Sequence, residues 1–392
     1  MSNGLHPPWK GGTDGAMYFS TNPPPKTLDP HRRLARSFIA DQLESARSVV
    51  LVTSGGTTVP LENQTVRFID NFSNGSRGAS SAEYFLKAGY AVIFLHRQFS
   101  LLPFSRHYSH STNCFLDLMS EDDSGNVIVD EDFQDQMRDM LRRYNAAKRA
   151  NKLLPLAFTT INEYLWSLKE LAVLMRPLGP RAMFYLAAAV SDFFLPRDRL
   201  SEHKIQSINV SKTNSEKHST LSNGLSETGE QNQLSIALDP VPKFLKDLVE
   251  GWAPEGMIVS FKLETDASVL IDKAQQALSK YSHHLVIGNL LSTRRHEVVF
   301  ITPKGEQWIK VPQHRRTVSV TTPSFLRKAF LENAHSEADT SIENGPVEIE
   351  SLIVPEVAAM HQRFIEFAQE NKEVDEQTML ANALAWAETG VD

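Results

Sequence analysis

Short, continuous apolar runs alternate with amphipathic stretches along most of the chain, and this alternation limits the possible folds more than any other feature. The run 49–53 (VVLVT) ends at Gly55 and Gly56, the stretch 79–89 has helical periodicity, and the run 90–96 (YAVIFLH) is again apolar throughout. A buried strand, a loop, a helix and a second buried strand form a βαβ unit. Strands without alternating polar residues are buried on both faces, so helices must cover both sides of a mostly parallel sheet.

The same alternation continues towards the C-terminus. We expect further buried strands over 182–190, 256–266 and 283–291, and an antiparallel hairpin over 297–312 with its turn at 303–305. We expect helices over 30–46, 132–151, 160–175 and 268–281, and another that starts near Pro323. The sequence therefore predicts an α/β fold: a Rossmann-like, mostly parallel sheet with helices on both faces and an antiparallel hairpin at one edge.

Changes in composition divide the chain into segments. Residues 1–29 are rich in proline and glycine, and we expect them to be disordered. One domain then covers 30–332, interrupted by a polar insertion at 207–233 that has almost no large apolar residues and is expected to be disordered. Residues 333–392 are predicted to form a polar linker followed by a helical tail, which packs on the domain or on a partner.

Composition and charge exclude several classes of protein. The 392 residues are 41% hydrophobic, which is enough for a sizeable core, and the net charge of −7 argues against a nucleic-acid-binding protein. A single cysteine, Cys114, excludes a disulfide framework and a thiolate metal site. The N-terminus has no apolar signal-peptide core, and Asp192 interrupts the longest apolar run, so we expect neither secretion nor a membrane span. We expect a cytoplasmic protein, and the sequence does not decide whether it is also found in the nucleus.

The stretch 71–78 (NFSNGSRG) permits two interpretations. It contains two N-glycosylation acceptor patterns, but these matter only on a secreted chain. It is also a small-residue loop in front of a helix, where main-chain N–H groups around Gly75 and Gly78 and the helix dipole favour an anion. Asn71 and Ser73 add hydrogen-bond donors to the same loop. The second interpretation predicts a phosphate-binding loop.

Four other stretches carry candidate chemistry, and each also has a purely structural interpretation. The loop 53–57 (TSGGT) forms either a close ligand contact or an ordinary turn, and 187–192 (AAAVSD) forms either a ligand-facing strand end or a close-packed strand with a helix cap. Lys204 either closes over a triphosphate from a mobile loop or is simply solvated. Residues 260–266 (SFKLETD) either meet a base, phosphate or metal or form a polar turn. Ligands bind beyond the carboxyl ends of parallel strands, so we expect these strand ends and Asn289 to lie near one another.

Two alternative functions follow from other features. Tyr144 and Lys148 fit the Y-x-x-x-K pair of a nicotinamide-dependent oxidoreductase, but the chain has no G-x-G-x-x-G loop after its first strand. It also lacks the G-x-x-x-x-G-K-[ST] loop of P-loop nucleotidases. The second alternative is a non-catalytic scaffold, in which the insertion and the helical tail bind partners.

Taken together and in this order, the motifs resemble eukaryotic phosphopantothenoylcysteine synthetase, also called phosphopantothenate–cysteine ligase. The resemblance runs from Val49 to about Pro312 without the insertion. The stretches that carry it are 50–62 (VLVTSGGTTVPLE), 66–97 (VRFIDNFSNGSRGASSAEYFLKAGYAVIFLHR), 183–196 (MFYLAAAVSDFFLP), 202–207 (EHKIQS) and 252–266 (WAPEGMIVSFKLETD). Asn74 and Thr58 depart from residues that are usual in animal relatives, and the insertion follows Lys204 closely.

The resemblance implies a ligase of coenzyme A biosynthesis, which joins 4′-phosphopantothenate to L-cysteine with a nucleoside triphosphate and Mg²⁺. The carboxylate forms an acyl-nucleotidylate with release of pyrophosphate, and the cysteine amine then displaces the nucleotide. The family leans towards ATP, but this sequence does not decide between ATP and CTP. The resemblance also implies a homodimer with shared active sites. The protein ligands of the metal are not identified by any motif.

The family's site residues map onto matching positions of this chain. Asn71 resembles the residue that binds phosphopantothenate and holds the acyl intermediate. Ala188, Ala189 and Asp192 match residues that bind the same substrate from the neighbouring subunit, and Lys204 matches a mobile catalytic lysine of bacterial relatives. The matching nucleotide contacts are Gly55, Ser73, Gly75, Gly78, Phe261 and Asn289.

Overall fold

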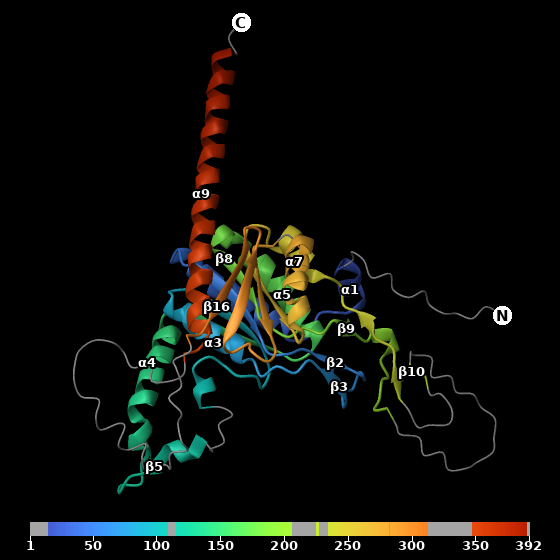
Figure 1. Cartoon of the computed structure of the whole chain (residues 1–392), viewed down its shortest axis with the longest axis vertical. Helices are drawn as coiled ribbons and strands as arrows, with labels where there is room; N and C mark the ends of the chain where they lie inside the picture. The colour runs from blue at the N-terminus through green and yellow to red at the C-terminus, as the bar shows by residue number, and fades with distance from the viewer. Residues whose placement is uncertain are drawn as a thin grey trace, which may run out of the picture.

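The computed structural model of the chain describes residues 15–108, 115–205, 225–226, 234–281, 283–312 and 347–389. At its centre lies an eight-stranded sheet in the order β16-β15-β14-β13-β8-β1-β4-β7 (Figure 1). The strands are β1 Val49–Ser54, β4 Ala91–Arg97, β7 Leu153–Phe158, β8 Ala182–Leu186, β13 Met257–Glu264, β14 Leu285–Leu290, β15 Glu297–Thr302 and β16 Gly305–Lys310. Neighbours from β7 to β14 are parallel, whereas β14, β15 and β16 pair antiparallel. The predicted α/β fold with its hairpin edge is confirmed.

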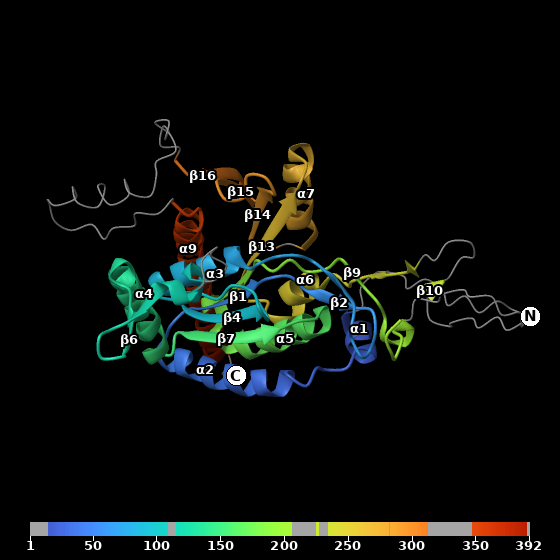
Figure 2. The same cartoon turned by 90° about the horizontal axis from the view of Figure 1, so that it is seen from below.

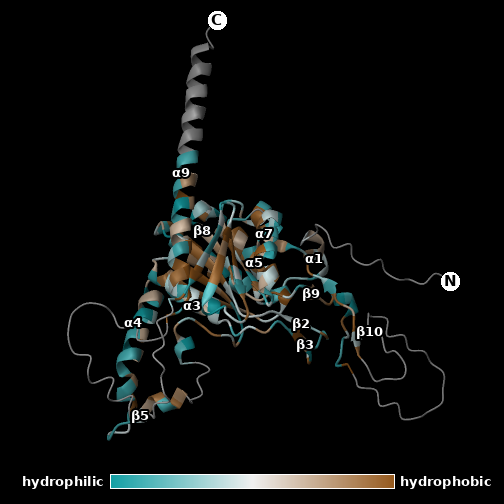
Figure 3. Ribbon diagram, in the orientation of Figure 1, coloured by the Kyte–Doolittle hydropathy of each residue, from teal (hydrophilic) through white to brown (hydrophobic). Residues whose placement is uncertain are grey.

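Helices cover both faces of the sheet (Figure 2). On one face lie α2 and α5, which pack on each other, and on the other lie α3 and α9. α7 packs on β13, β14 and β15. The bounds are α2 Leu28–Glu44, α3 Ser76–Lys87, α4 Gln134–Arg149, α5 Ile161–Met175, α7 Ala267–Tyr281 and α9 Glu350–Thr389. All six residues of β1 are buried, as expected for a strand between two helical layers. Figure 3 shows the hydrophobic residues concentrated in this sheet and on the helix faces against it.

The expectation of disorder over 1–29 is wrong for the part that the structure describes. Gly15–Thr21 forms helix α1, in which the side chains of Tyr18 and Phe19 are buried. The Tyr18 ring lies 5.2 Å from that of Phe194, and the Phe19 ring lies 4.7 Å from that of Trp166. Burial of two aromatic side chains outweighs the local preference of a Pro/Gly-rich segment for an irregular chain. Residues 1–14 lie outside the described part.

One strand of the sheet was not predicted, and another is shorter than expected. The unpredicted strand, β7, lies at the edge of the sheet, where the Pro155 that weakens its strand signal is tolerated. The strand expected over 182–190 ends at Leu186. After Leu186 the chain leaves the sheet, and Ala189 forms an isolated β-bridge with Gly56.

The C-terminal helix was predicted, and the structure shows where it packs. Ile349, Ile353, Val354 and Val357 are at most 1% exposed and belong to the same core as α3 and β8. The far end of α9 projects away from the body (Figure 1). The first turns of α9 are therefore part of the main domain. The linker 333–346, the helix expected near Pro323 and nearly all of the insertion 207–233 lie outside the described residues.

Candidate functional site

Three loops meet at the carboxyl end of β1 and are joined through their main chains. The Thr57 N–H donates to the carbonyl oxygen of Ala189 at 3.0 Å, and the Ala189 N–H donates to that of Gly55 at 2.8 Å. On the other side, the Asn71 N–H donates to the carbonyl oxygen of Thr57 at 3.2 Å. The loop after β1 thus lies between the phosphate-loop candidate and the alanine-rich segment, so two of the strand ends expected to meet, those after β1 and β8, do so.

Gly56 makes this junction possible. A Cβ at this position would lie 1.6 Å from the carbonyl oxygen of Asn71 and 2.8 Å from its carbonyl carbon. Because both are backbone atoms, no side-chain movement can relieve the clash. Two threonine hydroxyls add to the junction: the Ser191 N–H donates to Thr57 Oγ1 at 2.9 Å, and the Ala188 N–H donates to Thr53 Oγ1 at 3.1 Å.

The phosphate-loop candidate leads directly into α3. Gly75 precedes the helix with φ +80°, a left-handed conformation that favours glycine. Its carbonyl oxygen accepts a hydrogen bond from the Ser54 hydroxyl at 3.0 Å, and a Cβ on Gly78 would lie 2.5 Å from that same hydroxyl oxygen. The first turn of α3 contains no acidic residue. The positive end of the helix dipole and its N–H groups therefore face this loop, and no side chain of the first turn itself adds a negative charge there.

Phe261 and Asn289, the predicted contacts to the base and ribose of the nucleotide, lie on neighbouring strands and are called the base side here. Phe261 is on β13 and Asn289 is on the adjacent β14, opposite Leu263. The Phe261 ring packs edge-on against Tyr185 at 5.1 Å, and the Tyr185 hydroxyl lies 3.0 Å from the Ser81 hydroxyl of α3. These contacts connect Phe261 to the helix that follows the phosphate loop. Asn289 is only 6% exposed, so its side chain is largely covered in this state.

The acidic residues after Phe261 are engaged with their own neighbours. Glu264 lies 3.3 Å from the ammonium of Lys262 and 2.9 Å from that of Lys273. Burial acts to raise the pKa of Glu264, but the hydrogen bonds and charges of these two lysines outweigh it and lower the pKa overall. Asp266 accepts a hydrogen bond from the Ser268 N–H at 2.9 Å at the start of α7. Within the described ranges, no group of three or more His, Cys, Asp or Glu is placed to hold a metal ion.

The segment that carries Lys204 is held along the loop 62–67. The Asn63 N–H donates to the Ser201 carbonyl oxygen at 2.8 Å, and the Gln64 N–H donates to that of Glu202 at 3.2 Å. The Lys204 side chain itself is exposed. Main-chain hydrogen bonds thus attach the residues just before this lysine to the loop 62–67.

The carboxylate of Glu62 holds this segment through hydrogen bonds. Its side chain is fully buried and accepts hydrogen bonds from the N–H groups of Val66 and Arg67 at 3.0 and 2.8 Å, from the Arg67 guanidinium at 2.9 Å and from the Ile205 N–H at 3.3 Å. The same guanidinium donates to the Ile205 carbonyl oxygen at 2.9 Å. Burial acts to raise the pKa of Glu62, but these hydrogen bonds prevail and lower it. Sequence reasoning missed Glu62, because its partner Ile205 is 143 residues away along the chain.

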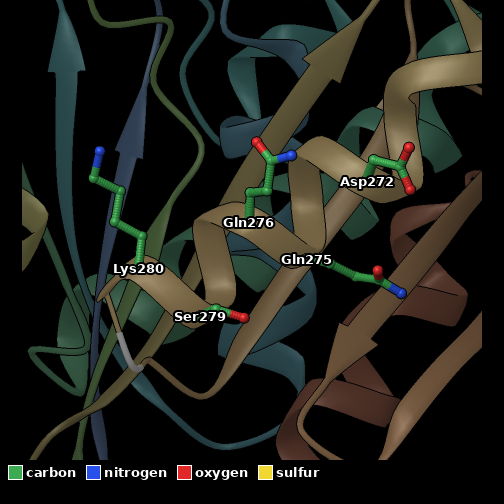
Figure 4. Close-up of a pocket in the computed structure, with 5 residues that line it drawn as sticks. All are labelled: Asp272, Gln275, Gln276, Ser279 and Lys280. Carbon is green, nitrogen blue, oxygen red and sulfur yellow. The ribbon is translucent and has the colours of Figure 1, made fainter.

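Two other features lie away from these loops. Tyr144 and Lys148 are on α4, where the Tyr144 ring packs edge-on against Phe104 at 5.7 Å. A surface hollow of about 560 Å³ lies along α7 (Figure 4). The residues that line it are Asp272, Gln275, Gln276, Ser279 and Lys280. It contains none of the predicted site residues.

Glu62→Gln tests the anchoring role of Glu62. A carboxylate whose pKa is lowered by folding stabilises the folded state above the pKa of a free glutamate, about 4.3, and this contribution is lost as pH falls through the folded-state pKa. We expect Glu62→Gln to lower the free energy of unfolding near pH 7 and to speed amide hydrogen exchange at Ile205. The deficit relative to wild type should shrink as pH is lowered from 6 towards 3. A deficit that stays constant over this range would contradict the role of the charge.

Comparisons with known proteins identify the family. No protein-family model matches the sequence. The chain is 46% identical to the phosphopantothenate–cysteine ligase CAB2 of Saccharomyces cerevisiae over 90% of its own length and 87% of that protein. It is 39% identical to the human phosphopantothenate–cysteine ligase over 81% of its length and 88% of that protein, and 40% identical to ligase 2 of rice (Oryza sativa subsp. japonica) over 83% and 95%.

A solved structure agrees with these relatives. A Cab2 variant with one histidine-to-alanine substitution, in complex with phosphopantothenate-cysteine, matches 90% of this chain and 99% of its own with 44% identity and a TM-score of 0.74. The same central sheet and surrounding helices are thus found in both proteins. The chain belongs to the phosphopantothenate–cysteine ligase family.

Proposed function

We propose that this ligase activates the carboxylate of 4′-phosphopantothenate as an acyl-nucleotidylate and couples it to L-cysteine. The observation that carries the proposal is the junction of three loops at the end of β1. It brings a phosphate loop, Gly55 and the segment 188–192 together in a chain whose relatives are named for this reaction.

The chemistry explains why such a site consists mostly of main-chain groups and small residues. A carboxylate oxygen attacks the α-phosphorus of the triphosphate, the bond to the β-phosphate oxygen breaks, and pyrophosphate leaves. The cysteine amine then attacks the acyl carbon, the bond to the nucleotide oxygen breaks, and the nucleoside monophosphate leaves while the amine loses a proton to solvent. The protein must mainly orient the reactants and stabilise phosphate charge, for which N–H groups and a helix N-terminus are suited.

Each predicted residue has a role in this scheme. The Asn71 side chain, next to the junction, would donate to the acyl group of the intermediate. Ala188, Ala189 and Asp192 of the partner subunit would bind phosphopantothenate, and Lys204 would approach the phosphates from its segment beside the loop 62–67. The proposed nucleotide contacts are Gly55, Ser73, Gly75, Gly78, Phe261 and Asn289.

ATP is the proposed nucleotide, with CTP as the alternative. Mg²⁺ belongs to the proposal because this ion is usually bound through substrate phosphates together with one or two carboxylates. It would neutralise charge on the triphosphate and on the leaving pyrophosphate. A comparison of pyrophosphate release with ATP, CTP, GTP and UTP decides between the nucleotides.

We also propose that two copies of the chain form a homodimer through an apolar patch beside the site. The hairpin of β2 (Thr58–Pro60) and β3 (Phe68–Asp70) and the strand β9 (Phe193–Phe194) expose large side chains there. These are Val66, Phe68, Ile69, Phe72 and Phe193, with Phe72 87% exposed. An interface between subunits would cover such exposed apolar side chains on the segments that carry the site. These residues flank Asn71 and Asp192 in the sequence. A second copy of the chain that packs on them would therefore bring its own site residues close to those of the first copy.

Asn71→Ala tests the assignment of the substrate loop. Wild type should release pyrophosphate only when phosphopantothenate and cysteine are both present. Asn71→Ala should lower that rate by about 10²–10³-fold, since a donor to the developing negative charge is lost, while the elution volume in size-exclusion chromatography stays unchanged. Asn145→Ala on α4 is the matched control and should keep the wild-type rate. A fully active Asn71→Ala variant would rule out this role.

Mixed dimers test whether the sites are shared between subunits. Asn71→Ala and Asp192→Ala are each expected to be inactive alone. If Asn71 of one subunit works with Asp192 of its partner, co-expression of the two variants leaves one intact site in each mixed dimer and restores roughly a quarter of wild-type turnover. If each site is built within one chain, the mixture stays inactive, and the shared-site proposal fails.

A further inference from the structure

Arg77 connects the phosphate loop to three other elements. It is the second residue of α3 and lies between Gly75 and Gly78 in the sequence. One terminal nitrogen of its guanidinium donates to the Glu350 carboxylate at 2.8 Å, and the other donates to the carbonyl oxygen of Arg294. The guanidinium carbon lies 5.8 Å from the centre of the Phe261 ring.

The partners of Arg77 are on the predicted base side and on the C-terminal helix. Phe261 is on β13, and Arg294 is in the turn that follows β14, the strand that carries Asn289. Glu350 is the first residue of α9. α3 and α9 lie side by side in both views (Figures 1 and 2). A single side chain therefore connects the proposed phosphate contacts, the proposed base contacts and α9.

This ion pair is shielded from solvent. The side chains of Arg77 and Glu350 are 15% and 13% exposed. Burial raises the pKa of Glu350, and the charge of Arg77 acts against this rise. The loss of one partner from a shielded pair leaves the other charge uncompensated, so the remaining side chain must move or recruit water. The position of Arg77 thus depends on Glu350.

A second acidic residue secures the same end of α9 independently. Glu348 accepts hydrogen bonds from the Arg106 guanidinium at 2.5 and 2.8 Å and from the Ser80 hydroxyl at 2.9 Å. The apolar residues Ile353 and Val357 bury the following turns. Because these contacts hold α9 on α3, the pair of Arg77 and Glu350 is not needed to keep the helix in place.

We propose that Arg77 is a positioning residue that sets the spacing between the phosphate side and the base side of the nucleotide site, and that Glu350 holds it in that position. This inference rests on the proposed function. It makes the C-terminal helix part of the nucleotide site, although no residue of α9 lies in a nucleotide-binding motif. Disturbing the pair should weaken nucleotide binding and leave the binding of the other two substrates unchanged.

The test compares Glu350→Gln and Arg77→Lys with Glu356→Gln, an exposed position on the same helix. Arg77→Lys keeps the charge but loses the planar fork that reaches two acceptors at once. In the pyrophosphate assay, we expect KM for the nucleotide to rise about tenfold in both variants. KM for phosphopantothenate and for cysteine should stay within about twofold of wild type, as should all three values in Glu356→Gln.

A double variant separates the specific pair from a general loss of stability. Arg77→Lys combined with Glu350→Gln should raise KM for the nucleotide no further than the more severe of the two single variants, since both disturb the same interaction. Additive effects, equal rises in all three KM values, or a nucleotide KM in Glu350→Gln that matches the control would each overturn the inference. If wild type itself releases no pyrophosphate with both substrates, the proposed function is what fails.

Discussion

The close contact between the main chains at Gly56 and Asn71 is the constraint on which the site depends. It requires a residue without a Cβ, because the nearest atom is a backbone oxygen. Through Thr57 and Ala189, the same loop also binds the alanine-rich segment after β8. The sheet supplies the parallel strands, but these few backbone contacts join the loops after β1 and β8 and the loop after β3 into one surface. Small residues are found there because each loop must approach the next through its main chain.

Outside this junction, buried polar pairs hold the parts of the site in place. Glu62 holds the segment with Lys204 against the loop that follows β2, and Glu350 holds Arg77 between the phosphate loop and Phe261. Neither carboxylate was among the predicted site residues, and both are shielded from solvent. A ligase that works mainly by orienting three substrates needs such supports, because small displacements of positioning groups cost large factors in rate.

The sequence predicted most of the sheet because its strands are signalled locally. The continuous apolar runs of β1 and β4 and the Pro-Lys-Gly turn of the hairpin depend on near neighbours only. It failed where distant contacts decide. Tyr18 and Phe19 order a Pro/Gly-rich segment by packing on aromatic residues far along the chain, and Glu350 meets Arg77 across 273 residues. The strands and loops that carry the proposed site were thus predictable, whereas the distant side chains that support them were not.

The central claim is that the main-chain contact at Gly56 assembles the site. Gly56→Ala should separate the two loops and lower pyrophosphate release by about 10²-fold or more, while far-UV circular dichroism stays that of the folded protein. Gly251→Ala is the matched control, because a Cβ there meets no atom within 4 Å. It should keep the wild-type rate. A folded Gly56→Ala enzyme that releases pyrophosphate as fast as this control would contradict the account.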